Sequence, residues 1–309
     1  MDTPQFETLA QSLTLTLQNL EMKRQDLKKQ GHTSGIWAGG IFFAIGTLFS
    51  LYIHAGFIGV GIAAVMSAFI YYTCVNTKSQ ELSAYYKQEV IAEVLQSFCE
   101  NAAFLPQHGI KESIFRNCNL FTSPDRYHTE DLIKGQVGKT EFCCAEVHAE
   151  EKRTRVDSKG RTSQYWVDIF KGFLFIADFH KDFRGHTVVQ RNRLFKLSLG
   201  NSRVKLENPD FEKTFDVYST DQIEARYLLT PSMMERLLAL EAHFRTGIMI
   251  SFQNSNILIA IPDSKNHFEA NIWKSISHPS QLKEDFSTIQ ALVSIIEDLN
   301  LNTRIWTKD

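Results

Sequence analysis

The sequence is poor in cysteine and proline and has almost no excess of charge. Its 309 residues include five cysteines and seven prolines, and the formal net charge is -2. The cysteines are odd in number and form no C-x-x-C pair, which suits a reducing cytosol and argues against a disulfide framework or a structural zinc site. Because the net charge is near zero, we expect no general attraction to nucleic acid and no nucleic-acid partner.

Sequence motifs of the common enzyme classes are absent as well. The chain has no G-x-x-x-x-G-K-[ST], no G-x-G-x-x-G after a strand, no H-E-x-x-H and no G-x-S-x-G. An active site would therefore have to be assembled from separated residues. We expect no cofactor, and we favour a non-enzymatic function.

The best candidate cluster for such a site follows an apolar run near the middle of the chain. It consists of Asp178, His180 and Asp182, which would share one face of an extended strand, with His186 a few residues further on. Carboxylates and imidazoles in this arrangement can bind a divalent metal or exchange protons. Polar strand ends often carry such residues, and the basic residues between them would neutralise the acids. We interpret the cluster as a strand end and expect no catalytic or metal-binding residues.

Charge is missing altogether from one long segment. Between Lys29 and Lys78 the chain has no Lys, Arg, Asp or Glu. A helix needs roughly 20 apolar residues to cross a bilayer core about 30 Å thick, and the apolar run at 35–75 is about twice as long. We predict two membrane spans, 36–53 and 57–75, joined by a tight turn at 54–56.

Small residues recur at every fourth position in both predicted spans. They are Ala55, Gly59, Ala63 and Ser67 in the second span, and Gly35 with Gly39 and Gly40 with Ala44 in the first. This spacing lets two helix backbones approach closely in a membrane. Glycine and alanine are also common in membrane helices generally, so a close helix pair and ordinary composition are equally good interpretations.

Basic residues flank both outer ends of the predicted hairpin. Lys23, Arg24, Lys28 and Lys29 precede the first span, and Lys78 and Lys87 follow the second, whereas the turn carries no charge. The positive-inside rule then places both termini in the cytoplasm. A signal peptide would need an apolar core nearer the start and a cleavage site, so we expect both spans to be retained in a multi-pass membrane protein.

Helical periodicity dominates on both sides of the spans. In residues 4–30, Phe6, Leu13, Leu20 and Leu27 recur every seven residues, which predicts an amphipathic helix that ends before 31–34. This stripe can form a coiled-coil seam between copies of the chain or lie against the chain itself. Residues 78–100 predict a helical stalk. Because the hairpin brings these two helices together, we favour packing within one chain.

Strand periodicity begins near residue 140. Residues 141–155 and 162–170 predict a long antiparallel hairpin, with Gly160 in its turn where a positive φ is wanted. We interpret its charged tip, EEKRTRVDSKGR, as solvated rather than as a contact for lipid headgroups or nucleic acid. Residues 172–179 are apolar at nearly every position, so this strand should lie in the middle of the domain.

The rest of the chain alternates between strands and helices. We predict a strand at 211–218, a helix at 231–245 with Thr230 as its cap and Pro231 in its first turn, a β-hairpin at 248–261 and an amphipathic helix at 282–299. This order indicates an α+β fold on a mainly antiparallel sheet. The expected parts are a cytosolic helix at 1–32, a transmembrane hairpin at 33–77, a helical stalk at 78–120 and a cytosolic α+β domain at 121–309.

Two blocks of sequence resemble a known family. They are F-K-G-F-L-F-I-A-D-F at 170–179, followed by R-G-H-T-V-V from Arg184, and F-E-K-T-F-D-V-Y-S-T-D-Q-I-E-A-R-Y-L-L-T-P from Phe211. The chain is similar here to a family of bacterial two-span membrane proteins known only as a domain of unknown function, sometimes titled galanin. The resemblance runs from the predicted hairpin to about Trp273. It implies a protein of the bacterial inner membrane with a cytosolic domain, and it brings no catalytic residues.

These observations predict a membrane-anchored cytosolic module that binds or scaffolds a protein or lipid partner. A homo-oligomer through the N-terminal helix is a further possibility. The alternative is a membrane-associated enzyme whose site combines Asp178 and His180 with a distant acid. A concave pocket around these residues would favour the enzyme, and a surface without clustered titratable groups would favour the binding module.

Overall fold

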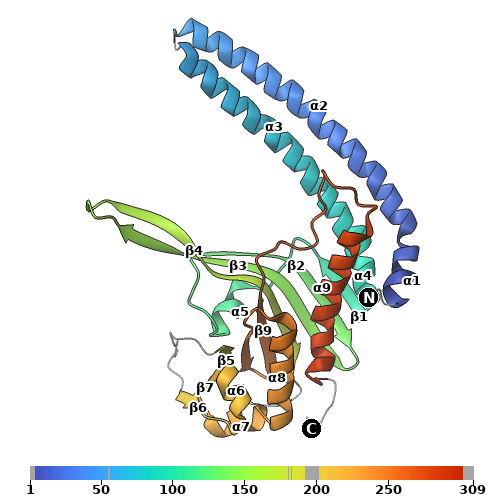
Figure 1. Ribbon diagram of the computed structural model, residues 1–309, viewed down its shortest axis with the longest axis vertical. Coiled ribbons are helices and arrows are strands. Elements are labelled where there is room, and N and C mark those ends of the chain that lie inside the picture. Colours follow the sequence, from blue (N-terminus) through green and yellow to red (C-terminus); the bar gives the residue numbers. More distant parts are fainter. Residues whose placement is uncertain (1–3, 55, 180, 182, 192–201, 302–309) are drawn as a thin grey trace. The chain divides into compact units, whose positions relative to one another are not determined.

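A computed structural model describes residues 4–54, 56–179, 181, 183–191 and 202–301 of the chain (Figure 1). The chain forms two compact units. Residues 1–94 and 267–287 make the first unit, and residues 95–266 and 288–309 make the second. The segment 267–287 therefore belongs with the N-terminal helices, although it follows most of the second unit in the sequence.

Helices dominate the first unit. α1 covers Pro4–Ser12, α2 covers Thr14–Tyr52 and α3 covers Gly56–Tyr86, and α3 continues through one π-helical turn at Lys87–Ile91 into α4 at Ala92–Gln96. Hydrogen bonds from the Leu13 N–H to the Leu9 carbonyl and from the Leu17 N–H to the Leu13 carbonyl connect α1 to α2. The chain thus stays helical almost from its start to Gln96, apart from the turn between α2 and α3.

The helices α2 and α3 pack side by side as an antiparallel pair, and both are long and apolar enough to cross a membrane (Figure 1). Only 17 % and 11 % of the residues in their most apolar windows are buried, whereas the core helix of a soluble domain is mostly buried. Trp37, Phe49 and Phe57 are among the large side chains that face outward. The two candidate spans predicted from the sequence are therefore present as helices.

Small residues bring α2 and α3 close together. Ser67 Oγ donates a hydrogen bond to the Gly39 carbonyl at 2.7 Å, and a Cβ added at Gly39 would lie 3.0 Å from the Ser67 carbonyl oxygen. A Cβ added at Gly46 would lie 2.8 Å from Ala63 Cβ, whereas one added at Gly40 would have no described atom within 4 Å. The small-residue spacing therefore forms a helix contact at Gly39, Ala63 and Ser67, but not at Gly40.

The predicted break between the N-terminal helix and the first span is wrong. α2 runs without interruption through Gly31 and Ser34. A glycine inside a helix costs about 1 kcal/mol relative to alanine, but here it permits close packing, because a Cβ at Gly31 would lie 3.3 Å from Val75 Cα. Ser34 Oγ donates to the Gln30 carbonyl one turn back, so its hydroxyl does not interrupt the helix.

The seven-residue stripe of the N-terminal helix is buried within the chain. Its four members are at most 7 % exposed. α2 packs along α3, and the Lys23 ammonium lies 2.8 Å from the centre of the Tyr85 ring. Ser12 Oγ lies 3.4 Å from a carboxylate oxygen of Glu93 in α4. These contacts agree with the packing within one chain that the sequence favours.

The segment 267–287 covers another part of the same helices. Glu21 pairs with Arg24 at 2.6 Å and accepts a hydrogen bond from the Ile276 N–H at 3.0 Å, while Arg24 donates to the Ile272 carbonyl at 2.7 Å. The hydrogen bond from Arg24 lowers the pKa of Glu21 to about 2, against the opposing effect of burial. This ion pair therefore fastens the segment to α2.

A second buried polar contact lies near the end of α3. The Tyr86 hydroxyl donates to Asp285 Oδ2 at 2.7 Å, and the Lys87 ammonium pairs with Glu269 at 2.6 Å. Burial raises the pKa of Asp285 to about 6 and raises the pKa of Tyr86 well above its usual value. Both contacts join α3 and its π-helical turn to residues from the far end of the sequence.

The second unit is built on one antiparallel sheet. Its described strands are β1 Glu100–Leu105, β2 Arg126–Val137, β3 Thr140–Val156, β4 Thr162–Asp178, β5 Thr187–Arg191, β6 Ser202–Val204, β7 Phe215–Ser219, β8 Met249–Gln253 and β9 Asn256–Pro262, in the spatial order β1-β2-β3-β4-β9-β8-β5-β7-β6. β4 pairs with β3 on one side and with β9 on the other. The predicted α+β class, the antiparallel sheet and the central place of residues 172–178 are confirmed.

Most helices of this part of the chain begin and end where the capping residues and the apolar periodicity of the sequence predict. The helices are α5 Glu112–Asn117, α6 Pro209–Thr214, α7 Gln222–Leu228, α8 Pro231–Phe244 and α9 Pro279–Asp298. Thr230 Oγ1 accepts a hydrogen bond from the Met233 N–H, and Pro231 occupies the first turn of α8, as predicted. The hairpin β8–β9 and the amphipathic helix α9 also lie where the sequence places them.

Two predicted elements differ from the structure. The strand predicted at 211–218 begins only at Phe215, because Asn208 accepts hydrogen bonds from the N–H groups of Asp210 and Phe211 and caps α6, with Pro209 in its first turn. This cap outweighs the strand-like composition that follows it. Residues Glu100–Leu105, inside the range expected to be helical, form β1 and pair with β2.

Aromatic side chains of the core hold β4 where it enters the sheet. Phe115 of α5 stacks on Phe121 with ring centroids 4.9 Å apart, and Phe121 lies 4.8 Å from Phe170 of β4. Phe115 and Phe170 are at most 4 % exposed. The hairpin formed by β3 and β4 is therefore anchored at its inner end by packed rings.

Candidate functional site

Of the cluster predicted around Asp178, the structure describes only Asp178 and the more distant His186. Asp178 is the last residue of β4 and pairs with Asn256 of β9. His180 and Asp182 lie outside the described residues. His186 instead contacts three other groups, through Nε2 to Ser251 Oγ (2.9 Å) and the Cys118 carbonyl (3.2 Å), and through Nδ1 to Asn119 Nδ2 (3.2 Å).

These contacts give His186 a structural role. Burial lowers the pKa of His186. A neutral imidazole that donates from Nε2 and accepts at Nδ1 satisfies the Cys118 carbonyl and the Asn119 amide together. His186 thus joins the loop after α5 to β8, and nothing in its described surroundings directs a catalytic proton transfer.

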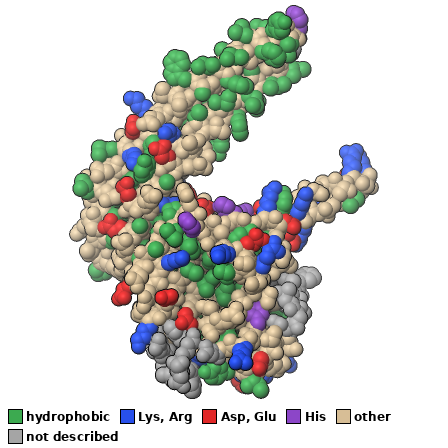
Figure 2. Space-filling model, turned by 180° about the vertical axis from the view of Figure 1, so that it is seen from behind, with side chains coloured by type: hydrophobic (Ala, Val, Ile, Leu, Met, Phe, Trp, Pro, Cys, Tyr) green, Lys and Arg blue, Asp and Glu red, His purple; other side chains and the backbone are tan. Residues whose placement is uncertain are grey.

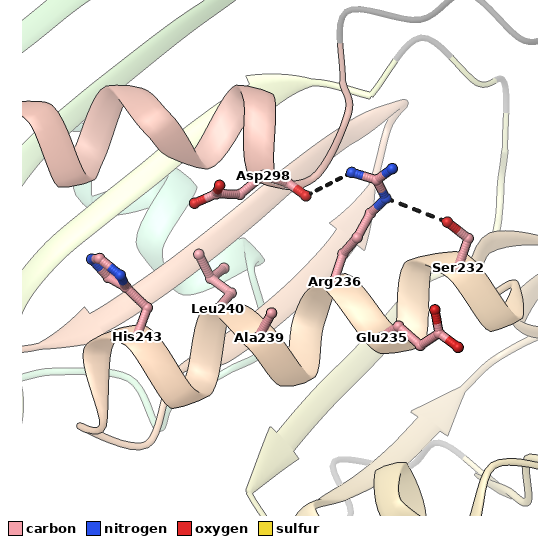
Figure 3. Close-up of a pocket in the computed structure, with 7 residues that line it drawn as sticks. All are labelled: Ser232, Glu235, Arg236, Ala239, Leu240, His243 and Asp298. Atoms are coloured by element: carbon pink, nitrogen blue, oxygen red, sulfur yellow. Dashed lines mark hydrogen bonds between the residues drawn. The ribbon is translucent and has the colours of Figure 1, made fainter.

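A shallow pocket of about 430 Å³ lies along α8 (Figure 3). Its lining residues are Ser232, Glu235, Arg236, Ala239, Leu240 and His243 of α8 and Asp298 of α9. Arg236 Nη1 donates to the Asp298 carbonyl at 2.9 Å, and Arg236 Nε donates to Ser232 Oγ at 3.3 Å. The guanidinium thereby bonds the last turn of α9 to α8. The pocket is a depression on a helix surface, and it contains none of the residues predicted for an active site.

The β3–β4 hairpin reaches far beyond the rest of the sheet (Figure 1). β2 pairs with β3 only as far as Glu150, and β9 pairs with β4 only from Gly172. In the part of the chain that the structure describes, residues 151–167 pair only with each other. We call residues 151–167 the hairpin extension. A free strand edge is a template on which another chain can add a strand.

Basic residues dominate the end of the hairpin extension. Five Lys or Arg and a single acid, Asp157, lie between Lys152 and Arg161, and all are exposed. Asp157 serves the turn, because its Oδ1 accepts hydrogen bonds from the N–H groups of Lys159 and Arg161 at 2.8 Å. No described acidic side chain forms an ion pair with Arg155, Lys159 or Arg161. Figure 2 shows Lys and Arg side chains gathered at the end of the hairpin extension.

Apolar and aromatic surface accompanies these charges. Tyr165 is 45 % exposed and Val156 is 62 % exposed. At the inner end of the hairpin extension, the Arg126 guanidinium lies 3.5 Å from the centre of the Trp166 ring. Arg, Tyr and Trp are the residues that most often contribute binding energy at protein interfaces. The hairpin extension therefore combines a free edge, cations and aromatic rings.

A second cluster lies where the hairpin extension leaves the sheet. His148 and Glu150 of β3 and Asp168 of β4 each place one potential ligand atom within 4.8 Å of the others. His148 Nε2 lies 2.8 Å from Asp168 Oδ1, and Glu150 lies 3.9 Å from the guanidinium of Arg126. Figure 2 shows histidine, acidic and basic side chains together at the base of the hairpin extension.

Sequence reasoning missed this second cluster for a specific reason. Counting outward from the turn, Val156 pairs with Thr162 and Glu150 with Asp168, so this pair could have been found. A β-bulge between Ala149 and Glu150 then shifts the register by one residue. No residue pattern in the sequence predicts this bulge. Counting residues outward from the turn therefore gives the wrong partner for His148.

The geometry defines an α+β domain joined to a pair of long apolar helices. The family described as "Protein of unknown function (DUF3137)" matches residues 168–301, which is less than half of the chain. The matched range includes the two sequence blocks at 170–179 and 211–231, and it does not include the apolar helices.

Curated proteins and solved structures offer two further comparisons. No curated protein matches the chain. Among solved structures, the chain is similar to the crystal structure of the mycobacterial trehalose monomycolate transport factor A, TtfA, with 10 % sequence identity and a TM-score of 0.36. That similarity covers 68 % of this chain and 93 % of the other.

Proposed function

We propose that the protein is a membrane-anchored module that binds an acidic protein partner through the hairpin extension. The observation that carries this proposal is a two-stranded ribbon with a free edge and exposed cations, on a chain that also has two long apolar helices. The ribbon supplies a binding surface, and the helices supply an anchor. Asp178 and His186, whose described contacts are structural, give no support to the enzyme alternative.

The anchor is the apolar part of α2 and α3. We propose that residues 33–77 cross the cell inner membrane twice, with both termini in the cytoplasm, because basic residues flank the outer ends and the turn has none. Alkaline phosphatase fused after residue 309 should then be inactive, whereas a fluorescent protein fused there should fold. High phosphatase activity would show that the orientation is wrong or that a single helix crosses.

The free edge favours a protein over a lipid as the partner. Unpaired backbone N–H and C=O groups on β4 can be satisfied in register by another polypeptide strand, whereas lipid headgroups would respond only to the charges. The exposed Lys and Arg side chains then select for acidic surfaces and speed their association. We therefore expect a partner that is sensitive to both the edge and the charge.

Photo-crosslinking in cells tests this function directly. A photoreactive amino acid replaces Tyr165 in the hairpin extension of the full chain, and the matched control carries it at Ile223, an 81 % exposed position on α7. A defined protein adduct is expected from position 165 only. The change Arg155→Glu should abolish it, and Lys213→Glu, at an exposed lysine on α6, should leave it intact.

Two results would contradict the proposal. Equal adducts from positions 165 and 223 would mean that crosslinking reflects exposure alone. Adducts with lipid and none with protein would mean that the hairpin extension contacts the membrane surface.

A further inference from the structure

We propose that His148, Glu150 and Asp168 form a binding site for a divalent transition-metal ion such as Zn²⁺. The three side chains come from two neighbouring strands at the base of the hairpin extension. The proposal does not depend on the proposed function, because it rests on the ligand atoms alone. It departs from the sequence-based expectation of no metal site, which considered only the cluster around Asp178.

The separation of the ligand atoms suits such an ion. One imidazole nitrogen and two carboxylate oxygens lie within 4.8 Å of one another. Zn²⁺ binds nitrogen and oxygen at about 2.0–2.2 Å in tetrahedral geometry, so two ligands of one ion lie about 3.3–3.6 Å apart. Rotation of the partly exposed side chains about their own bonds must bring the most distant ligand atoms about 1 Å closer together. His148 and Asp168 already meet at 2.8 Å and require the smallest change.

The chemistry of the donors selects the class of metal. Imidazole suits Zn²⁺ and its transition-metal neighbours, whereas Ca²⁺ and Mg²⁺ prefer sites made only of oxygen. Two carboxylates balance the charge of a divalent ion. His148 is 37 % exposed and Asp168 is 61 % exposed, so the ion can enter from solvent and keep water as a further ligand.

The surroundings offer a fourth ligand and a nearby competing cation. The register of β2 and β3 places His128 directly opposite His148, so both side chains lie on one face of the sheet. Lys171 lies opposite His148 in the register of β3 and β4, and the cation that contacts the cluster is Arg126. Its guanidinium stacks on Trp166 and lies 3.9 Å from Glu150, a weak contact that a metal ion can replace.

The position of the site gives metal binding a structural consequence. Glu150 is the last residue of β3 that pairs with β2, and beyond it the hairpin extension has no strand neighbour among the described residues. A metal ion held by His148, Glu150 and Asp168 would fasten β3 to β4 at this point and across the bulge. Binding should therefore stiffen the base of the hairpin extension.

Zn²⁺ titration of the full-length protein tests the site. The protein is purified in mild detergent with a tag that lacks histidine, treated with a chelator and studied by calorimetry and elemental analysis. One Zn²⁺ per chain is expected, and His148→Ala and Asp168→Asn should each weaken binding by at least about tenfold. His243→Ala, which removes an exposed histidine on α8, should leave the affinity unchanged.

Two further measurements use the unaltered protein, so they test the site even if a variant misfolds. X-ray absorption of the unaltered Zn²⁺-loaded protein should show nitrogen and oxygen ligands without sulfur, and Zn²⁺ should protect His148, but not His243, from diethylpyrocarbonate. The proposal is overturned if the protein binds no Zn²⁺, if sulfur from its free cysteines appears among the ligands, or if His148 stays reactive in the loaded protein.

Discussion

Charged side chains are arranged in opposite ways in the two units of this protein. In the first unit, Arg24 and Lys87 are buried, and each meets a carboxylate at 2.6 Å. In the hairpin extension of the second unit, Arg155 and Lys159 are exposed to solvent, and no described acid pairs with them. An unpaired charge is costly in a low-dielectric interior and inexpensive in water.

The buried ion pairs should therefore affect the stability of the fold, and the exposed cations should affect binding to a partner. Removing one member of a buried pair leaves its partner charged and desolvated, so we expect large changes in the free energy of unfolding. Removing an exposed cation should leave folding unchanged and alter only association with a partner. Four predictions are ordered from the largest expected effect on stability to the smallest; three concern charged groups and one concerns the packing of α2 and α3.

The largest effect is expected for Glu21→Ala. The change removes the partner of buried Arg24 and the acceptor of the Ile276 N–H, so it should destabilise the first unit by about 3 kcal/mol. Hydrogen exchange of residues 267–287 should become faster. The control is Glu112→Ala, which breaks an exposed Glu–Arg pair on α5 and should cost at most about 0.5 kcal/mol. Similar losses for both variants would remove the contrast between buried and exposed pairs.

The second prediction concerns pH. Burial raises the pKa of Asp285 from 3.8 to about 6, so the folded protein favours the neutral carboxyl group. The resulting stabilisation is fully present below about pH 4 and is lost as the pH rises through about 6. At pH 7.5, Asp285→Asn should therefore stabilise the first unit by about 2–3 kcal/mol.

Thermal unfolding in detergent at a series of pH values measures this effect. The amide oxygen introduced by Asp285→Asn can still accept the hydrogen bond from Tyr86, so the comparison isolates the charge. The difference between the two proteins should shrink as the pH falls from 7 to 4. A variant that is less stable than the parent at pH 7.5 would show that the ionised carboxylate is favoured in this environment.

The third prediction tests the helix pair. Gly46→Leu places a side chain where even a Cβ would lie 2.8 Å from Ala63 Cβ, so it should weaken the packing of α2 and α3 by about 1–3 kcal/mol. Gly40→Leu is the matched control, because a Cβ there meets no described atom within 4 Å. Unfolding by sodium dodecyl sulfate in mixed micelles measures both. Equal stability of the two variants would argue against close packing at Gly46.

The smallest effect on stability is expected in the hairpin extension. Arg155→Ser together with Lys159→Ser should change the free energy of unfolding by less than about 0.5 kcal/mol, because both side chains are exposed and neither forms a described ion pair. The same variant should lose the protein adduct formed from position 165. Retention of the adduct at full yield would show that Arg155 and Lys159 are not needed to bind the partner. Binding would then depend on the free strand edge.

Local signals explain the parts of the fold that the sequence predicts well. The hydroxyl of Thr230 and the ring of Pro231 begin α8 because both act within one helical turn. Gly160 has a φ of 72° in the hairpin turn, a conformation that favours glycine at that position. The cap at Asn208 is also a local signal, and it begins α6 inside the range 211–218 that the sequence composition predicts as a strand.

Burial of the N-terminal stripe was only partly predictable. The short turn between the apolar helices requires them to be antiparallel neighbours, so contact between α2 and α3 follows from the sequence. The contacts of Glu21 with Ile276 and of Tyr86 with Asp285 join residues 255 and 199 positions apart. No periodicity encodes such a contact.

Most of the elements follow from the sequence alone: the two apolar helices, the long charged hairpin, the cap of α8 and the α+β class depend on polarity and backbone preference over a few residues. The strand order, the return of residues 267–287 to α2 and α3, and the proximity of His148, Glu150 and Asp168 become visible only in the folded chain. These features depend on pairing between distant segments and on a one-residue bulge. The free energy that stabilises such pairing comes from contacts among many distant residues. A pattern within one short segment cannot predict it.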